Sequence, residues 1–132
     1  MTLVDTNVLL DVVTNDVRWA DWSVRQLDSA AVNGALAVNN VIYAEFSLRF
    51  TKIEALDAVL KEAGITMAAM PRSALFLAGK AFQRYRAAGG VRTGVLPDFF
   101  IGAHAAVAGL TLLTRDAQRY RTYFPKIDLV AP

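Results

Sequence analysis

Five short apolar runs alternate with longer helical patterns, and this alternation is the strongest constraint on the fold. The runs are TLVD, ALAV, ITMAAM, LTLLT and IDLVA, which begin at residues 2, 35, 65, 110 and 127. Continuous apolar runs are typical of strands buried on both faces, and helices between them require crossovers between parallel strands. The sequence therefore predicts a Rossmann-like α/β fold, a three-layer α/β/α sandwich around a mostly parallel sheet of four to five strands.

Proline and glycine mark the ends of the expected helices. No linker, repeat or low-complexity tract divides the 132 residues, so we expect a single domain over residues 1–132. The predicted order is strand, helix, strand, helix, helix, strand, helix, helix, strand, helix, strand. The main helices are expected over 17–33, 39–50, 52–64, 71–90 and 97–109.

Composition excludes several classes of protein. The chain has no cysteine, which excludes disulfides and thiolate metal sites and is compatible with a reducing cytoplasm. The longest uncharged stretch, FFIGAHAAVAGLTLL, is shorter than the roughly 18 to 20 residues of a membrane span and is expected to be core. The start MTLVDTN lacks a basic region, so we expect no signal or transit peptide, no membrane association and a cytoplasmic protein.

Four acidic residues fall where a parallel sheet gathers its ligands. Asp5 ends the first strand, Asp116 follows the LTLLT strand by two residues, and Asp98 lies in the first turn of a helix. Ligands bind at the carboxyl ends of parallel strands, so these three side chains could face one edge. Glu45 interrupts a mostly apolar helical stripe, which is an unusual place for a carboxylate.

Each of these acids also has a structural interpretation. The three aspartates could cap helices or favour the positive end of a helix, and Glu45 could pair with Arg49 one turn on. Together, however, clustered carboxylates repel one another unless a cation neutralises them. Ligands that are all oxygen favour Mg²⁺ or Mn²⁺, and the chemistry implied is phosphoryl transfer by a metal-activated water.

Other polar residues give weaker signals. His104 lies six positions after Asp98, about 240° around the helix, so it is expected in the core or an interface. No Walker loop, GxGxxG or recognisable Ser-His-Asp set occurs, which removes support for nucleotide hydrolysis, dinucleotide binding and ester hydrolysis. A further group is expected to be solvated or to cap helices: Asp11, Asp16, Asp21 and Asp28.

Basic residues form two clusters although the net charge is only +2. Either cluster could be a solvated helix face or could bind a polyanion. The clusters are Arg84, Arg86 and Arg92, and Arg115, Arg119 and Arg121 with Lys126 soon after.

Four motifs occur in one order along the whole chain: VDTNVLLD, YAEF, LPDFFIGAHA and LLTRDAQRY. As a set they resemble a PIN-domain ribonuclease, specifically a VapC-type toxin of a type II toxin–antitoxin pair. The resemblance implies metal-dependent endonucleolytic cleavage of RNA, with Asp5, Glu45, Asp98 and Asp116 holding magnesium or manganese. It also implies that Asn7 and Thr114 orient those carboxylates and that Thr6 is structural.

The same resemblance implies partners. These are a second copy of the chain in a homodimer and a small VapB-like antitoxin, whose C-terminal part covers the acidic groove, often with a basic side chain. The RNA backbone is expected to contact Arg84, Arg86, Arg92, Arg115 and Arg119. Target selection is expected in the residues after Glu45 and in the loop GGVRTGVLP.

Three alternatives stay open at this point. One is a PIN-fold RNA-processing nuclease outside a toxin–antitoxin pair, and another is a non-catalytic RNA- or protein-binding module. A signalling receiver domain is disfavoured because ITMAAMP offers no aspartate to accept phosphate.

Overall fold

One five-stranded sheet organises the computed structural model, which describes residues 1–132. All four strand pairings are parallel, and the strand order is β3-β2-β1-β4-β5. The strands are β1 (Thr2–Val4), β2 (Leu36–Val38), β3 (Ile65–Met67), β4 (Thr111–Leu113) and β5 (Asp128–Val130). The predicted α/β class is confirmed, and the sheet is wholly rather than mostly parallel.

Seven helices connect these strands. They are α1 (Thr6–Val13), α2 (Ala20–Asn33), α3 (Asn40–Ser47), α4 (Ile53–Glu62), α5 (Arg72–Ala87), α6 (Leu96–Ala108) and α7 (Gln118–Tyr123). No helix is long and apolar enough to cross a membrane.

Two helices, rather than the single one predicted, connect β1 to β2. Asp5 caps α1 by accepting a hydrogen bond from the backbone N–H of Thr6. Asn15 then takes a positive φ of 49°, and the Asp16 carboxylate accepts hydrogen bonds from the backbone N–H groups of Arg18 and Trp19. This turn separates α1 from α2. Asp16 closes the turn but does not cap α2, whose N-cap is Trp19 with no side-chain hydrogen bond.

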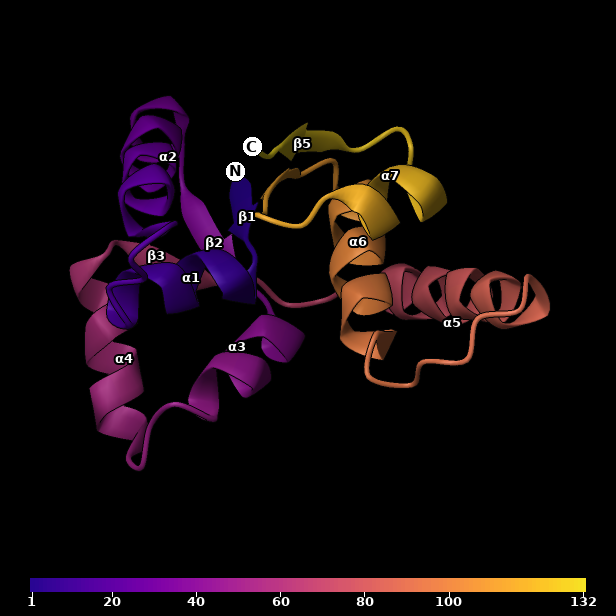
Figure 1. The fold of residues 1–132 in the computed structure, drawn as a ribbon, viewed down its shortest axis with the longest axis horizontal. Coiled ribbons are helices and arrows are strands. Elements are labelled where there is room, and N and C mark those ends of the chain that lie inside the picture. Colours follow the sequence, from indigo (N-terminus) through magenta and orange to yellow (C-terminus); the bar gives the residue numbers. More distant parts are fainter.

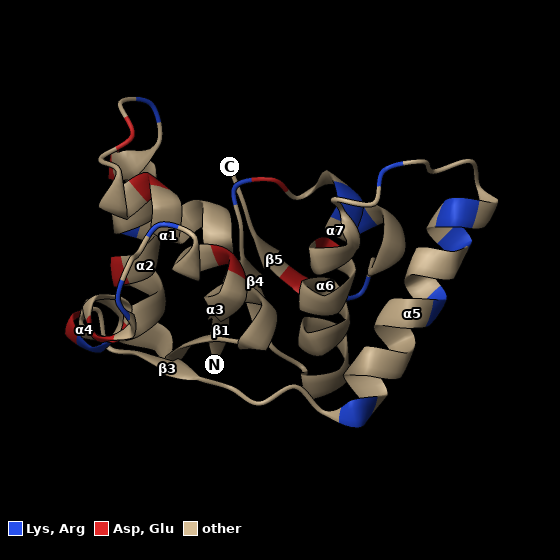
Figure 2. Cartoon of the chain, turned by 90° about the horizontal axis from the view of Figure 1, so that it is seen from below, with Lys and Arg blue, Asp and Glu red and all other residues tan.

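The direction of the chain across the sheet reverses between β1 and β4. The chain runs outward from β1 to β2 and β3, returns through α5 and α6 to β4 on the other side of β1, and ends at β5. Right-handed crossovers in opposite directions place helices on opposite faces of a sheet. Accordingly, α1–α4 and α5–α7 form two groups, which meet where α3 contacts α6 (Figures 1 and 2). A crevice at such a reversal is where open α/β sheets bind ligands.

The core lies between the sheet and these helices. Leu3, Val4, Leu112 and Leu113 on the two central strands are completely buried. His104 on α6 is also buried, and its Nδ1 lies 3.2 Å from Nδ2 of Asn39. His104 is thus a hydrogen-bonded core residue, one of the two roles predicted for it.

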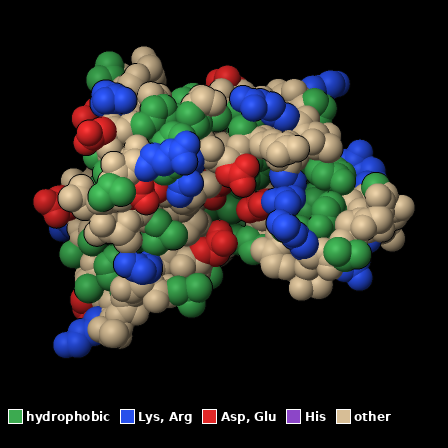
Figure 3. All heavy atoms as spheres, in the orientation of Figure 1, with side chains coloured by type: hydrophobic (Ala, Val, Ile, Leu, Met, Phe, Trp, Pro, Cys, Tyr) green, Lys and Arg blue, Asp and Glu red, His purple; other side chains and the backbone are tan.

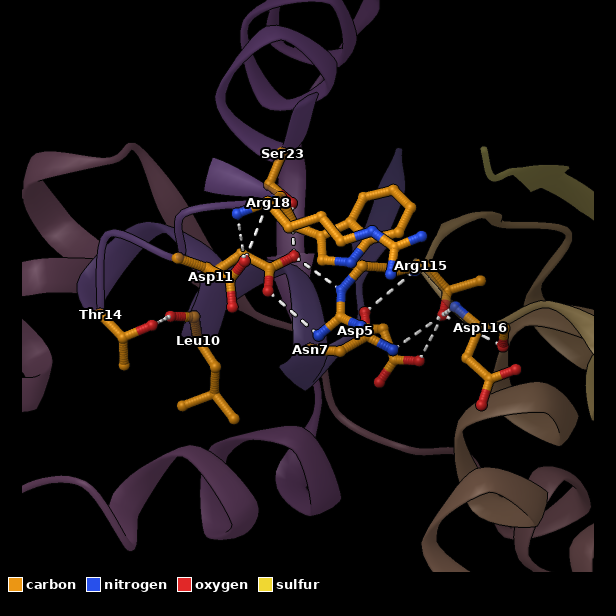
Figure 4. A network of polar contacts seen from close by, with 12 residues as sticks. Asp5, Asn7, Leu10, Asp11, Thr14, Arg18, Ser23, Arg115 and Asp116 are labelled. Carbon is orange, nitrogen blue, oxygen red and sulfur yellow. Dashed lines mark hydrogen bonds and ion pairs between the residues drawn. The ribbon is translucent and has the colours of Figure 1, made fainter. Parts of the chain in front are cut away.

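Asp11 corrects one prediction, because it is buried rather than solvated. Its carboxylate accepts hydrogen bonds from Ser23 Oγ at 2.8 Å, Arg115 Nε at 2.9 Å and Arg115 Nη2 at 3.1 Å. The guanidinium of Arg115 also lies 5.4 Å from the centre of a Trp19 ring. This network ties α1, α2 and the segment after β4 together (Figure 4). Asp21 and Asp28 are exposed, as expected.

Gly102 on α6 allows the end of α7 to pack closely. A Cβ at this position would overlap the ring of Phe124 and would lie 3.1 Å from Cδ1 of Tyr120. We expect Gly102→Ala to lower the free energy of unfolding by about 1–3 kcal/mol, as overpacking does. Chemical denaturation measures this loss.

Gly79→Ala is the matched control, since nothing lies within 4 Å of a Cβ at this position in α5. Better helix propensity should make this variant neutral or up to about 1 kcal/mol more stable. Equal losses in the two variants would contradict the assigned packing of α6 against α7.

Candidate active site

The four predicted carboxylates line one pocket at the carboxyl edge of the sheet. Asp5 directly follows β1, Glu45 lies on α3, Asp98 lies in the first turn of α6, and Asp116 follows β4. The pocket has a volume of about 210 Å³, and its remaining lining residues are Thr6, Asn7, Leu10 and Tyr120. Four segments distant in sequence therefore meet where the chain direction reverses.

Asp5 lies deepest and is the most strongly held of the four acids. It is 5% exposed. Its Oδ1 accepts a hydrogen bond from the Thr6 N–H at 2.7 Å, and its Oδ2 accepts hydrogen bonds from Thr114 Oγ1 at 2.8 Å and Tyr120 OH at 2.9 Å. Burial raises the pKa of Asp5 from 3.8 to about 6; the nearby charge of Asp98 adds to this, and the hydrogen bonds oppose it.

Thr114 and Asn7 connect Asp5 to the segment after β4. Thr114 is fully buried, and its Oγ1 accepts hydrogen bonds from Asn7 Nδ2 at 3.2 Å and from the Asp116 N–H at 3.2 Å. Asn7 Oδ1 accepts a hydrogen bond from the Arg115 N–H at 3.0 Å. Thr114 thus contacts Asp5 directly, whereas Asn7 acts on it through Thr114.

Glu45 is held by Thr6, not by the arginine one turn away. Thr6 Oγ1 donates a hydrogen bond of 2.8 Å to Glu45 Oε1, and Arg49 forms no ion pair. The pKa of Glu45 is raised overall, chiefly by burial. The charge of Asp98 also raises it, and the hydrogen bond from Thr6 lowers it. Thr6 therefore positions two of the acids, because its N–H bonds Asp5 and its hydroxyl bonds Glu45.

Asp98 is paired with a basic residue. Arg119 Nη1 donates to Asp98 Oδ2 at 2.6 Å, and the Asp98 side chain is 32% exposed. The pKa of Asp98 is raised overall, chiefly by burial. The charge of Asp116 also raises it, and the Arg119 guanidinium lowers it. Asp116 itself is exposed, and its carboxylate forms no hydrogen bond or ion pair.

The chemistry of this donor set fits a hard divalent cation. No three acidic side chains converge closely enough to ligate one ion. Asp98 is instead hydrogen-bonded to Arg119, and Glu45 to Thr6. Yet the charged groups that line the pocket are all carboxylates, with no thiol or imidazole among them. Hard cations prefer such oxygen ligands, and their charge would relieve the repulsion between the acids.

Tyr120 is the contact to Asp5 that the sequence did not reveal. It is 1% exposed, and its hydroxyl donates to Asp5. Burial and the surrounding acids raise the pKa of Tyr120 well above its usual range, so the hydroxyl stays protonated and remains a donor. A tyrosine in a short helix resembles any core aromatic residue, and only its position beside Asp5 distinguishes it.

The five arginines predicted to contact RNA lie in different places. Arg92 and Arg119 line a polar pocket beside the acidic one, and Arg115 is bound to Asp11. Arg84 lines a largely apolar cavity between α5, α6 and the segment that joins α7 to β5, and Arg86 lies over the ring of Phe82. In the space-filling view, acidic side chains gather near the middle of one face with basic side chains beside them (Figure 3).

The chain belongs to the PIN domain family, whose model matches residues 2–125. Comparison with curated proteins by sequence gives no match.

Solved structures show the same fold over the full length. A chain of VapBC2 from Rickettsia felis, bound to a DNA fragment from its promoter, matches with a TM-score of 0.75 and 19% identity, covering 99% of this chain and 98% of that one. DNA-bound VapBC from Salmonella typhimurium gives a TM-score of 0.70 and 16% identity, with coverage of 98% and 96%. FitAcB from Neisseria gonorrhoeae gives 0.68 and 18%, also with coverage of 98% and 96%.

The raised pKa of Asp5 predicts how stability depends on pH without divalent metal. The folded chain retains a proton that the unfolded chain releases, so the contribution of Asp5 falls as the pH rises from about 4 to about 6. A pKa of about 6 in place of 3.8 corresponds to roughly 3 kcal/mol. Urea denaturation between pH 4 and 7.5 in the presence of a chelator measures this loss.

Asp5→Asn provides the comparison because it removes the titrating group. The difference in unfolding free energy between the original chain and Asp5→Asn should shift against the original chain as the pH rises through this window. A difference that stays constant with pH would contradict the buried, proton-retaining Asp5.

Proposed function

We propose that this chain is a metal-dependent endoribonuclease that acts as the toxin of a toxin–antitoxin pair. The observation that carries the proposal is the meeting of four carboxylates from four separate segments in one pocket, at the reversal point of a parallel sheet. Membership of the PIN domain family and full-length likeness to chains of VapBC complexes support it.

Asp5, Glu45, Asp98 and Asp116 would hold Mg²⁺ or Mn²⁺ in this proposal. Such a metal supplies a water of lowered pKa as the nucleophile and stabilises charge on the phosphate. The chain's own contribution is to orient the acids: Thr114 and Tyr120 fix Asp5, and Thr6 fixes Glu45. Asp98 would have to part from Arg119, whose guanidinium would then be free to bind an RNA phosphate.

The first test measures metal binding separately from cleavage. Mg²⁺ or Mn²⁺ should raise the melting temperature, since an ion that binds only the folded state stabilises it. Asp98→Asn should lose most of this rise and should reduce the cleavage of cellular RNA by about 100-fold or more, because even partners of ligands contribute 10- to 100-fold. Asp28→Asn, the same change at an exposed site on α2, should behave as the original chain.

The outcomes separate the alternatives. A metal response without cleavage of any RNA would favour a binding module over a nuclease. If neither ion changes the melting temperature and no RNA is cut, the metal-dependent nuclease is wrong.

An antitoxin is the second part of the proposal. The similar structures include complexes named VapBC and FitAB and a toxin–antitoxin complex from Klebsiella pneumoniae. We infer a small partner whose C-terminal part covers the acidic groove with a basic side chain, because such a group answers the same negative charge as the metal does. We also infer a homodimer, which light scattering of the purified chain would detect.

This partner predicts both a gene arrangement and a competition. A short open reading frame for a DNA-binding protein should lie directly upstream, and its product should copurify with this chain. A peptide from the C-terminal part of that product should abolish the rise in melting temperature caused by Mn²⁺. A chain that cleaves RNA but has no such neighbour would instead be an RNA-processing nuclease.

A further inference from the structure

A second pocket adjoins the acidic pocket on the side of α7. It has a volume of about 350 Å³ and is lined by the end of α5, the loop after it, the segment after β4, and α7. Asp116 lines both pockets, and Arg119 of the second pocket is bonded to Asp98 in the first. A group in the second pocket would therefore lie beside the carboxylates.

Two arginines give this pocket its positive charge. Arg92 lies in the loop between α5 and α6, is exposed and forms no ion pair. Arg119 uses only Nη1 to bond Asp98, which leaves Nε and Nη2 without a hydrogen-bond partner. The loop between α5 and α6, which carries Arg92, and α7, which carries Arg119, lie on the same side of the molecule (Figure 2). Guanidinium groups with free donors are well suited to phosphate oxygens.

Two tyrosines form the aromatic part of the lining. Tyr85 and Tyr123 are partly exposed, and their ring centres lie 6.1 Å apart with the planes at 75°. Gln118 on α7 also lines the pocket, and its amide carries both donors and an acceptor. Unpaired bases stack on aromatic side chains and are read by hydrogen bonds to their edges. The volume is within the usual range for small-ligand sites.

The loop that carries Arg92 is fixed by Tyr85. The backbone N–H of Arg92 donates a hydrogen bond of 3.2 Å to the Tyr85 hydroxyl. Gly89 has a φ of 95°, and a Cβ at Gly90 would overlap the Tyr85 ring. These contacts hold the loop against Tyr85 of α5 before any ligand binds, and this lowers the entropic cost of binding.

We propose that this pocket binds one unpaired nucleotide of the RNA, next to the bond that is cut. Arg92 and Arg119 hold its phosphate, and its base lies against Tyr85 and Tyr123 within reach of Gln118. This inference rests on the proposed function, since it takes RNA as the ligand. It assigns the positioning of the substrate to a single pocket and leaves Arg84, Arg86 and Arg115 outside it.

The test measures binding of a labelled single-stranded RNA 10-mer of random sequence to the full chain, with a chelator present so that metal-dependent cleavage cannot occur. Arg92→Ala should weaken binding about tenfold, the loss expected for one charged hydrogen bond. It should also make the slope of log K against log salt less steep by about 0.7. Tyr85→Phe retains the ring and removes the hydroxyl that holds Arg92, and it should weaken binding about threefold.

Arg25→Ala is the matched control, because Arg25 is an exposed arginine on α2, outside both pockets. It should leave the affinity and the salt slope unchanged. An RNA duplex of the same length should bind more weakly, since its bases stay stacked. Equal losses in Arg92→Ala and Arg25→Ala, or equal affinity for duplex and single strand, would overturn the nucleotide pocket.

The binding assay does not require cleavage, so failure of the pocket and failure of the proposed nuclease can be distinguished. Metal-dependent cleavage together with binding that does not depend on Arg92 would overturn the pocket and leave the proposed nuclease standing. Arg92-dependent binding by a chain that cuts no RNA would overturn the nuclease, and with it the placement of the pocket beside a cleaved bond.

Discussion

The parallel pairing of β1 with β4 is the constraint on which the rest of the site depends. The register places Val4 opposite Leu113, so the next residue on each strand brings Asp5 beside Thr114. The Asp5 N–H continues the ladder by donating to the Leu113 carbonyl at 2.9 Å. A slip of one residue would turn every side chain to the opposite face, separating the carboxylate from its hydroxyl partner. The register of the backbone hydrogen bonds therefore determines which side chains are neighbours in the pocket.

The hydroxyl groups around the acids serve a second purpose. Carboxylates brought together in a partly buried pocket lose hydration and repel one another. Thr6, Thr114 and Tyr120 donate hydrogen bonds that offset part of this cost without adding positive charge. It matters that these groups are neutral, because a buried cationic side chain in their place would neutralise the negative charge that the proposed metal is to neutralise. The hydroxyl groups thus stabilise the folded pocket and leave the charge of its carboxylates available to the proposed metal.

The sequence predicted the fold well because each strand is a short apolar run bounded by clear turn or capping residues. It missed the split between α1 and α2, since that break depends on the positive φ of Asn15 and on the backbone hydrogen bonds to Asp16, not on a change in periodicity. The four acids were singled out by their positions. Asp5 ends a strand, and Asp116 follows a strand by two residues. Asp98 lies in the first turn of a helix, and Glu45 interrupts an apolar pattern.

Pairings between distant residues were harder to predict. The contacts of Tyr120 with Asp5 and of Arg115 with Asp11 join residues more than 100 positions apart. Neither residue breaks a local pattern, so only the folded geometry reveals them. The same is true of Arg119, whose bond to Asp98 could not be distinguished from a role in RNA binding.

The bond between Arg119 and Asp98 means that the chain carries its own counter-ion. A guanidinium attached to the same chain is present at a high effective concentration, which does not depend on the salt or metal concentration of the solution. Binding of a free cation at Asp98 would therefore be a displacement, in which an ion from solution competes with a tethered one. In the proposed nuclease, the affinity of the pocket for a metal would then depend partly on whether Arg119 finds another hydrogen-bond acceptor. A bound phosphate beside α7 would accept hydrogen bonds from Arg119. Substrate and metal would then favour each other's binding although they contact different atoms.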